Sequence, residues 1–213
     1  DLWGVPDEQQ EMLLSTSVSL PGIQEILTLV NREFLTVTEG DELLRLQGFP
    51  DEMASHIMEL RKFYPGPQDL VMLAGREAFE EDAISRFQLD TDMPPELEAV
   101  AAKAGITPEI LRWYWIAHWQ NPSINQVFEM IHRRVQKPDA AGRPGLGGTF
   151  DTDDLDVYYR LADVNPFFGD LLRQIAYQPL TRVDVRRMRQ LGVLDEEQVV
   201  NAYKDLGYDE TNA

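Results

Sequence analysis

Apolar side chains recur at every third or fourth position in many short stretches of the chain, which is the spacing of helices buried along one side. In residues 21–35, Ile23, Ile26, Leu27 and Val30 follow this spacing. Similar patterns predict helices over 6–18, 41–47, 50–63, 65–79, 155–162, 181–191 and 195–206, and two more within 105–134 that meet at Asn121-Pro122. Alternation of apolar and polar residues is limited to 34–38. The pattern therefore predicts an all-α protein, with at most a small hairpin in a glycine-rich loop.

The stretch 21–33 is the first copy of an internal repeat. A shift of 44 residues aligns it with 65–77, a shift of 101 aligns it with 122–134, and a more divergent fourth copy starts at Asn165. Gly48, Gly105 and Gly192 precede comparable helices, and glycine can take the left-handed conformation that closes the helix before it. The sequence thus predicts an array of short helix-proline-helix repeats.

Side chains suited to capping stand at the expected helix starts. Ser123 and Gln126 have the spacing of a capping box, and Thr181 and Asp184 have the same spacing. In the fourth copy, phenylalanine occupies the cap position, so Asn165 is the predicted cap.

The longest stretch without a helical pattern is 136–154, which is rich in glycine, proline and aspartate. We expect it to be an exposed loop. It separates predicted N-terminal helical repeats, residues 1–135, from a C-terminal helical region, residues 155–213. The two regions form either separate parts or one continuous domain.

Composition restricts the partners of this chain. It has 213 residues, 43% of them hydrophobic, and a net charge of −18. Binding to a phosphate backbone depends on clustered cations, so direct nucleic-acid binding is not expected. The acids are spread along the chain, and we interpret them as a solvated surface. The sequence contains no cysteine, which excludes disulfides and thiolate sites.

The printed sequence shows neither a signal peptide nor an apolar run long enough to span a membrane. It begins at Asp1 rather than at methionine. We expect a processed product or a fragment of a longer protein, in which case a targeting segment would lie outside it.

Aromatic residues concentrate in the stretch 105–134. Trp113, Trp115 and Trp119 lie there, and His118 sits between the last two in the sequence. Large aromatics at this spacing fill the contacts between helices or the surface between subunits, and we predict this role for them, although a platform for stacking sugars or bases is the alternative. His118 is predicted to be a packed, hydrogen-bonded imidazole, with metal binding or proton transfer as the alternatives.

An arginine recurs near the end of the repeated helix, as Arg32, Arg76 and Arg133. A cation there suits the negative helix terminus, and we expect the guanidinium to bridge to the neighbouring repeat. Arg133 therefore joins the four aromatic residues named above as a candidate interface or core contact.

Motifs that carry chemistry are missing from the sequence. It has no phosphate-binding loop, no HExxH and no GxSxG. The acidic cluster that begins at Asp151 resembles the start of a calcium loop, but Leu155 stands at the fifth position of such a loop and Ala162 at the twelfth, where the closing glutamate belongs. We predict no catalytic residue, no metal site and no cofactor.

Two segments resemble a known group of proteins. The runs RWYWIAHWQNPSINQVFEMIHRR and LADVNPFFGDLLRQIAYQPLTRVDVRRMRQLGVLDEEQVVNAYKDLGY are similar to segments of large helical structural proteins of tailed bacteriophages, in which an AHWxxPS segment, an MxHR ending and a PLTRVDVRRM segment recur. The resemblance covers about residues 65–210. It implies a virion component of the head-to-tail region or the tail, and it assigns no catalytic residue.

We therefore expect a non-enzymatic helical-repeat module that binds copies of itself or neighbouring virion proteins, located in the virion and made in the host cytoplasm. Two alternatives remain open at this stage. One is a protein that degrades or binds cell-wall glycan during entry, and the other is a soluble adaptor that binds a partner helix in a groove.

Overall fold

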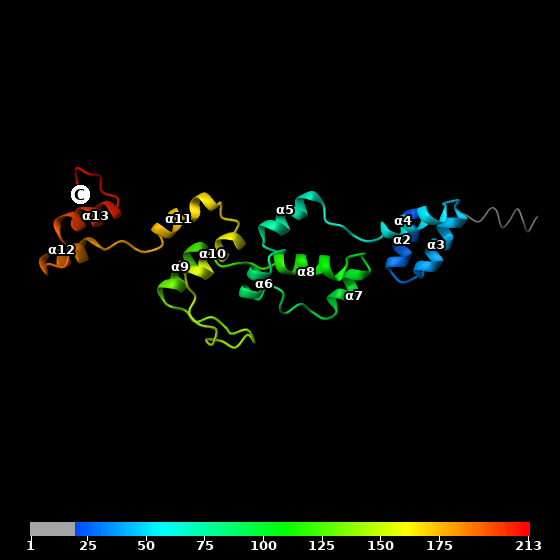
Figure 1. The fold of residues 1–213 in the computed structure, drawn as a ribbon, viewed down its shortest axis with the longest axis horizontal. Coiled ribbons are helices and arrows are strands. Elements are labelled where there is room, and N and C mark those ends of the chain that lie inside the picture. Colours follow the sequence, from blue (N-terminus) through cyan, green and yellow to red (C-terminus); the bar gives the residue numbers. More distant parts are fainter. Residues whose placement is uncertain (1–19) are drawn as a thin grey trace, which may run out of the picture. The chain divides into compact units, whose positions relative to one another are not determined.

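The computed structural model describes residues 20–213, and the helix expected over 6–18 lies outside them. The described residues form helices without a strand, which confirms the predicted all-α class (Figure 1). The chain divides into two compact units at Trp119 and Gln120. The first contains α2 (Ile23–Asn31), α3 (Val37–Leu46), α4 (Asp51–Glu59), α5 (Pro67–Gly75), α6 (Glu81–Phe87), α7 (Leu97–Ala102) and α8 (Pro108–Ala117). The second contains α9 (Ile124–His132), α10 (Thr152–Leu161), α11 (Pro166–Gln174), α12 (Arg182–Gln190) and α13 (Glu196–Asp205).

Three helices at the start of the first unit enclose a core. Helices α2 and α4 both pack against α3 (Figure 1). Their buried side chains are Ile26, Leu27, Val30, Leu44, Ala54, Ile57 and Met58. Gly40 allows α2 to approach α3 closely, because a Cβ atom at this position would lie 2.7 Å from Cγ2 of Val30. Thr36 caps α3 and forms a capping box with Glu39, so 34–38 leads into a helix rather than a strand.

The rest of the first unit is organised around α8. Helices α5 and α7 pack against it, and α8 buries Ile110, Leu111 and Ile116. Gly105 precedes α8 with a φ of 79°, and its carbonyl accepts a hydrogen bond of 2.8 Å from the N–H of Phe63. A Cβ atom on Gly105 would lie 2.2 Å from the carbonyl oxygen of Arg61. The helices α6 and α7 have no counterpart among the predicted elements.

Helices α2, α5 and α9 share the features expected of one repeated helix. Each has nine residues, and their first residues are separated by the predicted shifts of 44 and 101. Each ends at an arginine that is followed by a residue of positive φ: Glu33, Glu77 and Arg134 respectively. The recurrence belongs to these three helices, and the wider helix-proline-helix array stays a prediction.

The second unit begins with α9 and α10, which are linked by a hydrogen bond from the Tyr158 hydroxyl to the carbonyl of Pro122. The sequence allows at most a small hairpin in the glycine-rich loop between them. The loop contains one isolated antiparallel bridge, between Gln136 and Thr149. At the C-terminal end α12 and α13 pack against each other, with Val185 and Ala202 buried. The predicted division at 136–154 stays a prediction, and this loop lies within the second unit.

Candidate functional site

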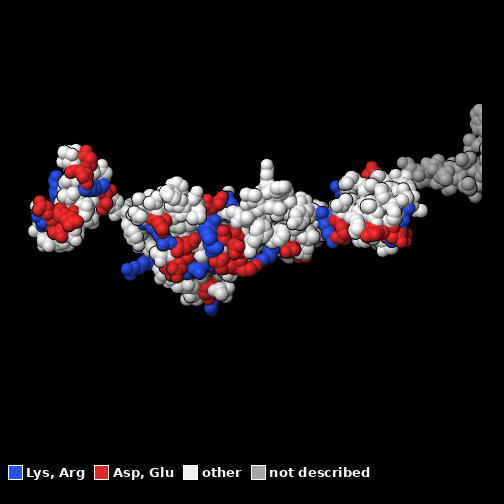
Figure 2. All heavy atoms as spheres, turned by 45° about the horizontal axis from the view of Figure 1, so that its top comes forward, with Lys and Arg blue, Asp and Glu red and all other residues white. Residues whose placement is uncertain are grey.

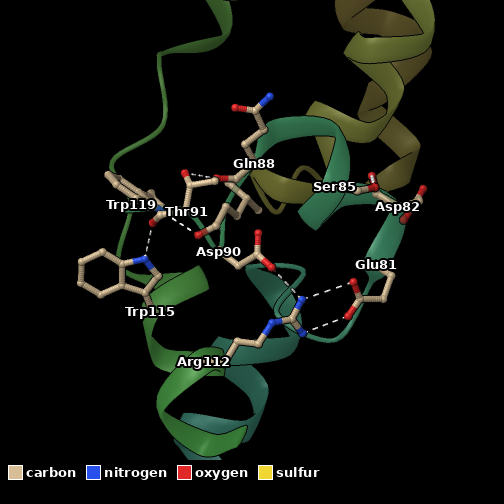
Figure 3. Close-up of polar contacts among 10 residues, drawn as sticks. Glu81, Asp82, Ser85, Gln88, Asp90, Thr91, Arg112, Trp115 and Trp119 are labelled. Atoms are coloured by element: carbon tan, nitrogen blue, oxygen red, sulfur yellow. Dashed lines mark hydrogen bonds and ion pairs between the residues drawn. The ribbon is translucent and has the colours of Figure 1, made fainter. Parts of the chain in front are cut away.

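Helix α8 and the two residues that follow it carry the aromatic residues singled out in the sequence. Thr107 caps α8 by accepting a hydrogen bond of 3.4 Å from the N–H of Ile110, and Pro108 occupies its first position. Arg112, Trp115 and Trp119 follow at helical spacing, so they project towards the same segment of the first unit. That segment contains α6 and the turn over 88–92 (Figure 3).

Arg112 joins two acids from that segment. Its Nη1 lies 2.9 Å from Oε1 of Glu81, and its Nη2 lies 3.0 Å from Oδ2 of Asp90 (Figure 3). The hydrogen bond to Glu81, followed in size of effect by the one to Asp90, raises the pKa of the Arg112 guanidinium above its ordinary value. All three side chains remain partly exposed to solvent, so the ion pairs contribute little to the stability of the fold. Their main effect is to fix the position of α6 and the turn over 88–92 beside α8.

Two tryptophans hold the turn over 88–92. The indole N–H of Trp115 donates a hydrogen bond of 2.7 Å to the carbonyl of Thr91, and that of Trp119 donates one of 2.7 Å to the carbonyl of Leu89 (Figure 3). Gln88 and Asp92 have positive φ values of 53° and 59°. The aromatic face of α8 is therefore attached to a sharply turned loop, with both indole donors satisfied.

His118 lies between the two tryptophans. Its ring centroid is 4.1 Å from that of Trp115 and 4.3 Å from that of Trp119, and its Nδ1 contacts the carbonyl oxygen of Trp115. The side chain is exposed to solvent, unlike a core imidazole. Trp113 is separate from this group and packs edge-on against Phe79, with ring centroids 5.0 Å apart. We call Trp115, His118 and Trp119 the aromatic cluster.

Arg133 belongs to the second unit. Its Nη2 lies 2.7 Å from Oε2 of Glu129, one turn earlier in the same helix. This ion pair lies within one repeat, and the expected bridge to a neighbouring repeat stays a prediction for this residue. Its flexible side chain reaches an acid in its own helix at less cost than one in another element.

The acidic stretch after the glycine-rich loop is a helix start with a buried ion pair. Asp151 caps α10 by accepting hydrogen bonds from the N–H groups of Asp153 and Asp154. Asp154 has no exposed surface, and its Oδ2 lies 2.6 Å from Nζ of Lys137. The interpretation of these acids as a solvated surface is therefore wrong for Asp154. In residues 20–213, no group of three or more histidines and acids has the arrangement of a metal site.

A hollow of about 350 Å³ lies in the second unit beside α9. Phe128 and His132 of α9 line it together with the linker over 175–179. The His132 and Tyr177 rings are in contact there at a tilt of 34°, with centroids 4.6 Å apart. Neither this hollow nor the Arg112 ion pairs were predicted from the sequence. For Arg112 a signal existed, since it has helical spacing with Trp115 and Trp119.

Comparisons with protein-family models, with curated proteins and with solved structures find no match to this chain. None of the helices in the part of the chain that the structure describes has the length and apolar character needed to cross a membrane.

Proposed function

We propose that this chain is a non-enzymatic assembly module that binds copies of itself or neighbouring proteins in a tailed-phage particle, in the head-to-tail region or the tail. The observation that carries this proposal is the exposure of large apolar side chains in both units. In the first unit Leu60 is 72% and Val71 74% exposed, and in the second unit Phe167 is 72% and Leu191 78% exposed. Apolar surface of this kind becomes buried when a protein binds another protein.

The charge of the chain supports a protein partner over a nucleic acid. Acids outnumber cations by thirty-seven to nineteen. On the face drawn in Figure 2, carboxylate side chains occur among the cations in every described part. A backbone of phosphates would be repelled by this surface, whereas a protein with a basic face would be attracted.

The phage setting rests on the resemblance of the segments AHWQNPS, MIHRR and PLTRVDVRRM to structural proteins of tailed bacteriophages. The first of these segments contains His118 and Trp119, which are two of the three residues of the aromatic cluster. Under this proposal the cluster holds the fold of the first unit and presents an exposed ring, His118, to a neighbouring protein.

Purification of particles tests the proposal. A tagged copy of the chain is expressed while particles are produced, and the particles are separated on a density gradient. We expect the tagged chain to sediment with the particles and to withstand a salt wash. Recovery of the chain solely with free proteins, at the top of the gradient, contradicts the proposal.

A further inference from the structure

The last three helices of the chain correspond to the first three described helices. The shift of 145 residues that places Pro21 on Pro166 also places the α3 cap Thr36 on the α12 cap Thr181. The same shift places Asp51, the first residue of α4, on Glu196, the first residue of α13. One ungapped alignment therefore relates α2, α3 and α4 to α11, α12 and α13.

The two groups differ in how the first helix is packed. In α2 the side chains of Ile26, Leu27 and Val30 are buried against α3 and α4. Their counterparts are Leu171, Leu172 and Ile175, which are also apolar. Yet α11 buries none of its residues, and Leu171 and Ile175 are 47% and 71% exposed. Helix α11 thus has the apolar pattern of α2, but its apolar side chains are not buried against the two helices that follow it.

The connection after each first helix explains this difference. After α2 the chain reverses through Glu33, whose φ is 64°, and the N–H of Phe34 donates a hydrogen bond of 2.9 Å to the carbonyl of Leu29. The counterparts of Glu33 and Phe34 are Gln178 and Pro179. Proline has no N–H to donate, and it restricts the residue before it to extended conformations. The turn that folds α3 back onto α2 is therefore unavailable to α12.

The linker between α11 and α12 is instead occupied elsewhere. The Tyr177 ring packs against the His132 ring of α9, and Pro179 lines the same hollow beside α9. A linker that cannot form a tight reversal favours exchange of the following element between two copies of a chain.

One further difference fits a wider contact with the α12 and α13 pair. Phe168 of α11 stands where α2 has Ile23. The larger side chain fills a wider space between the helices.

Charge also favours a second copy as the partner. Helix α12 contains Arg182, Arg186, Arg187 and Arg189 within nine residues of a chain whose net charge is −18. Beside α11 lies the acidic helix α10, since Asp156 of α10 forms an ion pair with Arg173 of α11. A basic helix that docks on α11 therefore meets acids.

We propose that the α12 and α13 pair of one copy packs on α11 of a second copy, and that this exchange makes the chain a dimer. The inference rests on the proposed assembly function and names its partner as a second copy of this chain. A reciprocal exchange is closed, because each copy gives one helix pair and receives one.

Light scattering coupled to size-exclusion chromatography tests the dimer. We expect the full chain to have about twice the 24.4 kDa mass of one copy. The double substitution Leu171→Glu and Ile175→Glu is expected to weaken association at least about tenfold, because carboxylates would enter an apolar contact. Val100→Glu is the matched control, since Val100 is 64% exposed on α7, and this variant is expected to remain a dimer. A monomeric wild-type chain overturns the proposal, as does an unchanged dimer of the double variant.

A designed variant tests the exchange itself. Restoring the reversal with Gln178→Gly and Pro179→Phe is expected to give a monomer, and a dimer of unchanged stability contradicts the exchange. The proposed function has a separate readout, incorporation into particles. A monomeric chain that still sediments with particles therefore overturns the dimer and not the proposed function.

Discussion

Lys137 and Asp154 form an ion pair that ties the glycine-rich loop to helix α10. The Nζ of Lys137 lies 2.6 Å from a carboxylate oxygen of Asp154, a residue with no exposed surface. The same oxygen accepts a hydrogen bond of 3.0 Å from the N–H of Asp151. The loop is therefore held at its base by a buried charge that needs its partner.

Lys137→Ala is expected to lower the free energy of unfolding by about 3 kcal/mol, because it removes an ion-pair partner from a buried carboxylate. Urea unfolding of the full chain measures this change. The matched control is Lys204→Ala, which removes an ion pair of the same 2.6 Å length to Glu210, whose side chain is 87% exposed. We expect the control to change the free energy by less than about 1 kcal/mol. Equal effects of the two substitutions would show that burial does not matter at Asp154.

Gly105 is expected to tolerate alanine poorly. Its φ of 79° would cost any other residue about 1–2 kcal/mol, and the added Cβ would also lie 2.2 Å from the Arg61 carbonyl oxygen. Gly48→Ala isolates the conformational cost, since Gly48 has a φ of 97° and nothing within 4 Å of the added atom. Thermal melting should show a clearly larger loss for Gly105→Ala than for Gly48→Ala. A smaller loss at Gly105 would contradict the close approach to Arg61.

Trp115 is expected to contribute both packing and a hydrogen bond. Trp115→Ala should lower the free energy of unfolding by about 3 kcal/mol. Trp115→Phe keeps most of the packing but loses the donor to the Thr91 carbonyl, and should cost about 1 kcal/mol. Urea unfolding measures both, and amide hydrogen exchange over 88–92 reports whether the turn loosens. If the folded stability stays unchanged while binding to particles is lost, the residue serves a partner and not the fold.

The tip of the glycine-rich loop is expected to depend on pH. The Arg143 side chain, followed by backbone N–H groups, lowers the pKa of Asp139 below its ordinary value. A carboxylate with a lowered pKa in the folded chain stabilises the loop above its unfolded pKa, and this contribution is lost as pH falls through the folded pKa. A carboxyl titration by NMR should place the pKa of Asp139 below that of a model peptide. Arg143→Ala should raise it, and a pKa that does not respond to this substitution would contradict the assignment.

Local patterns were sufficient to predict the helix starts at Ser123, Asn165 and Thr181, where the side chain of each cap accepts a backbone hydrogen bond. Such caps are visible in sequence because a cap and its partner lie within a few residues of each other. The helices α6 and α7 were missed because they have seven and six residues, too few to display a period.

Contacts between distant residues were not predictable in the same way. Arg112 is separated from Glu81 by 31 residues and from Asp90 by 22, and Lys137 is separated from Asp154 by 17. Nothing near Asp154 in the sequence distinguishes it from the neighbouring exposed acids, because its burial is a property of the folded loop. The apolar pattern of α11 was predicted correctly, whereas its exposure depends on the single proline in the following linker.

Amide hydrogen exchange of α11, measured in the full chain over a range of protein concentrations, tests the central claim most directly. Helix α2 serves as the internal reference, because its apolar side chains are covered within its own chain. We predict that α2 is protected at all concentrations and that protection of α11 rises with concentration, as a second copy covers Leu171 and Ile175. Protection of α11 that does not change with concentration would contradict assembly through this helix.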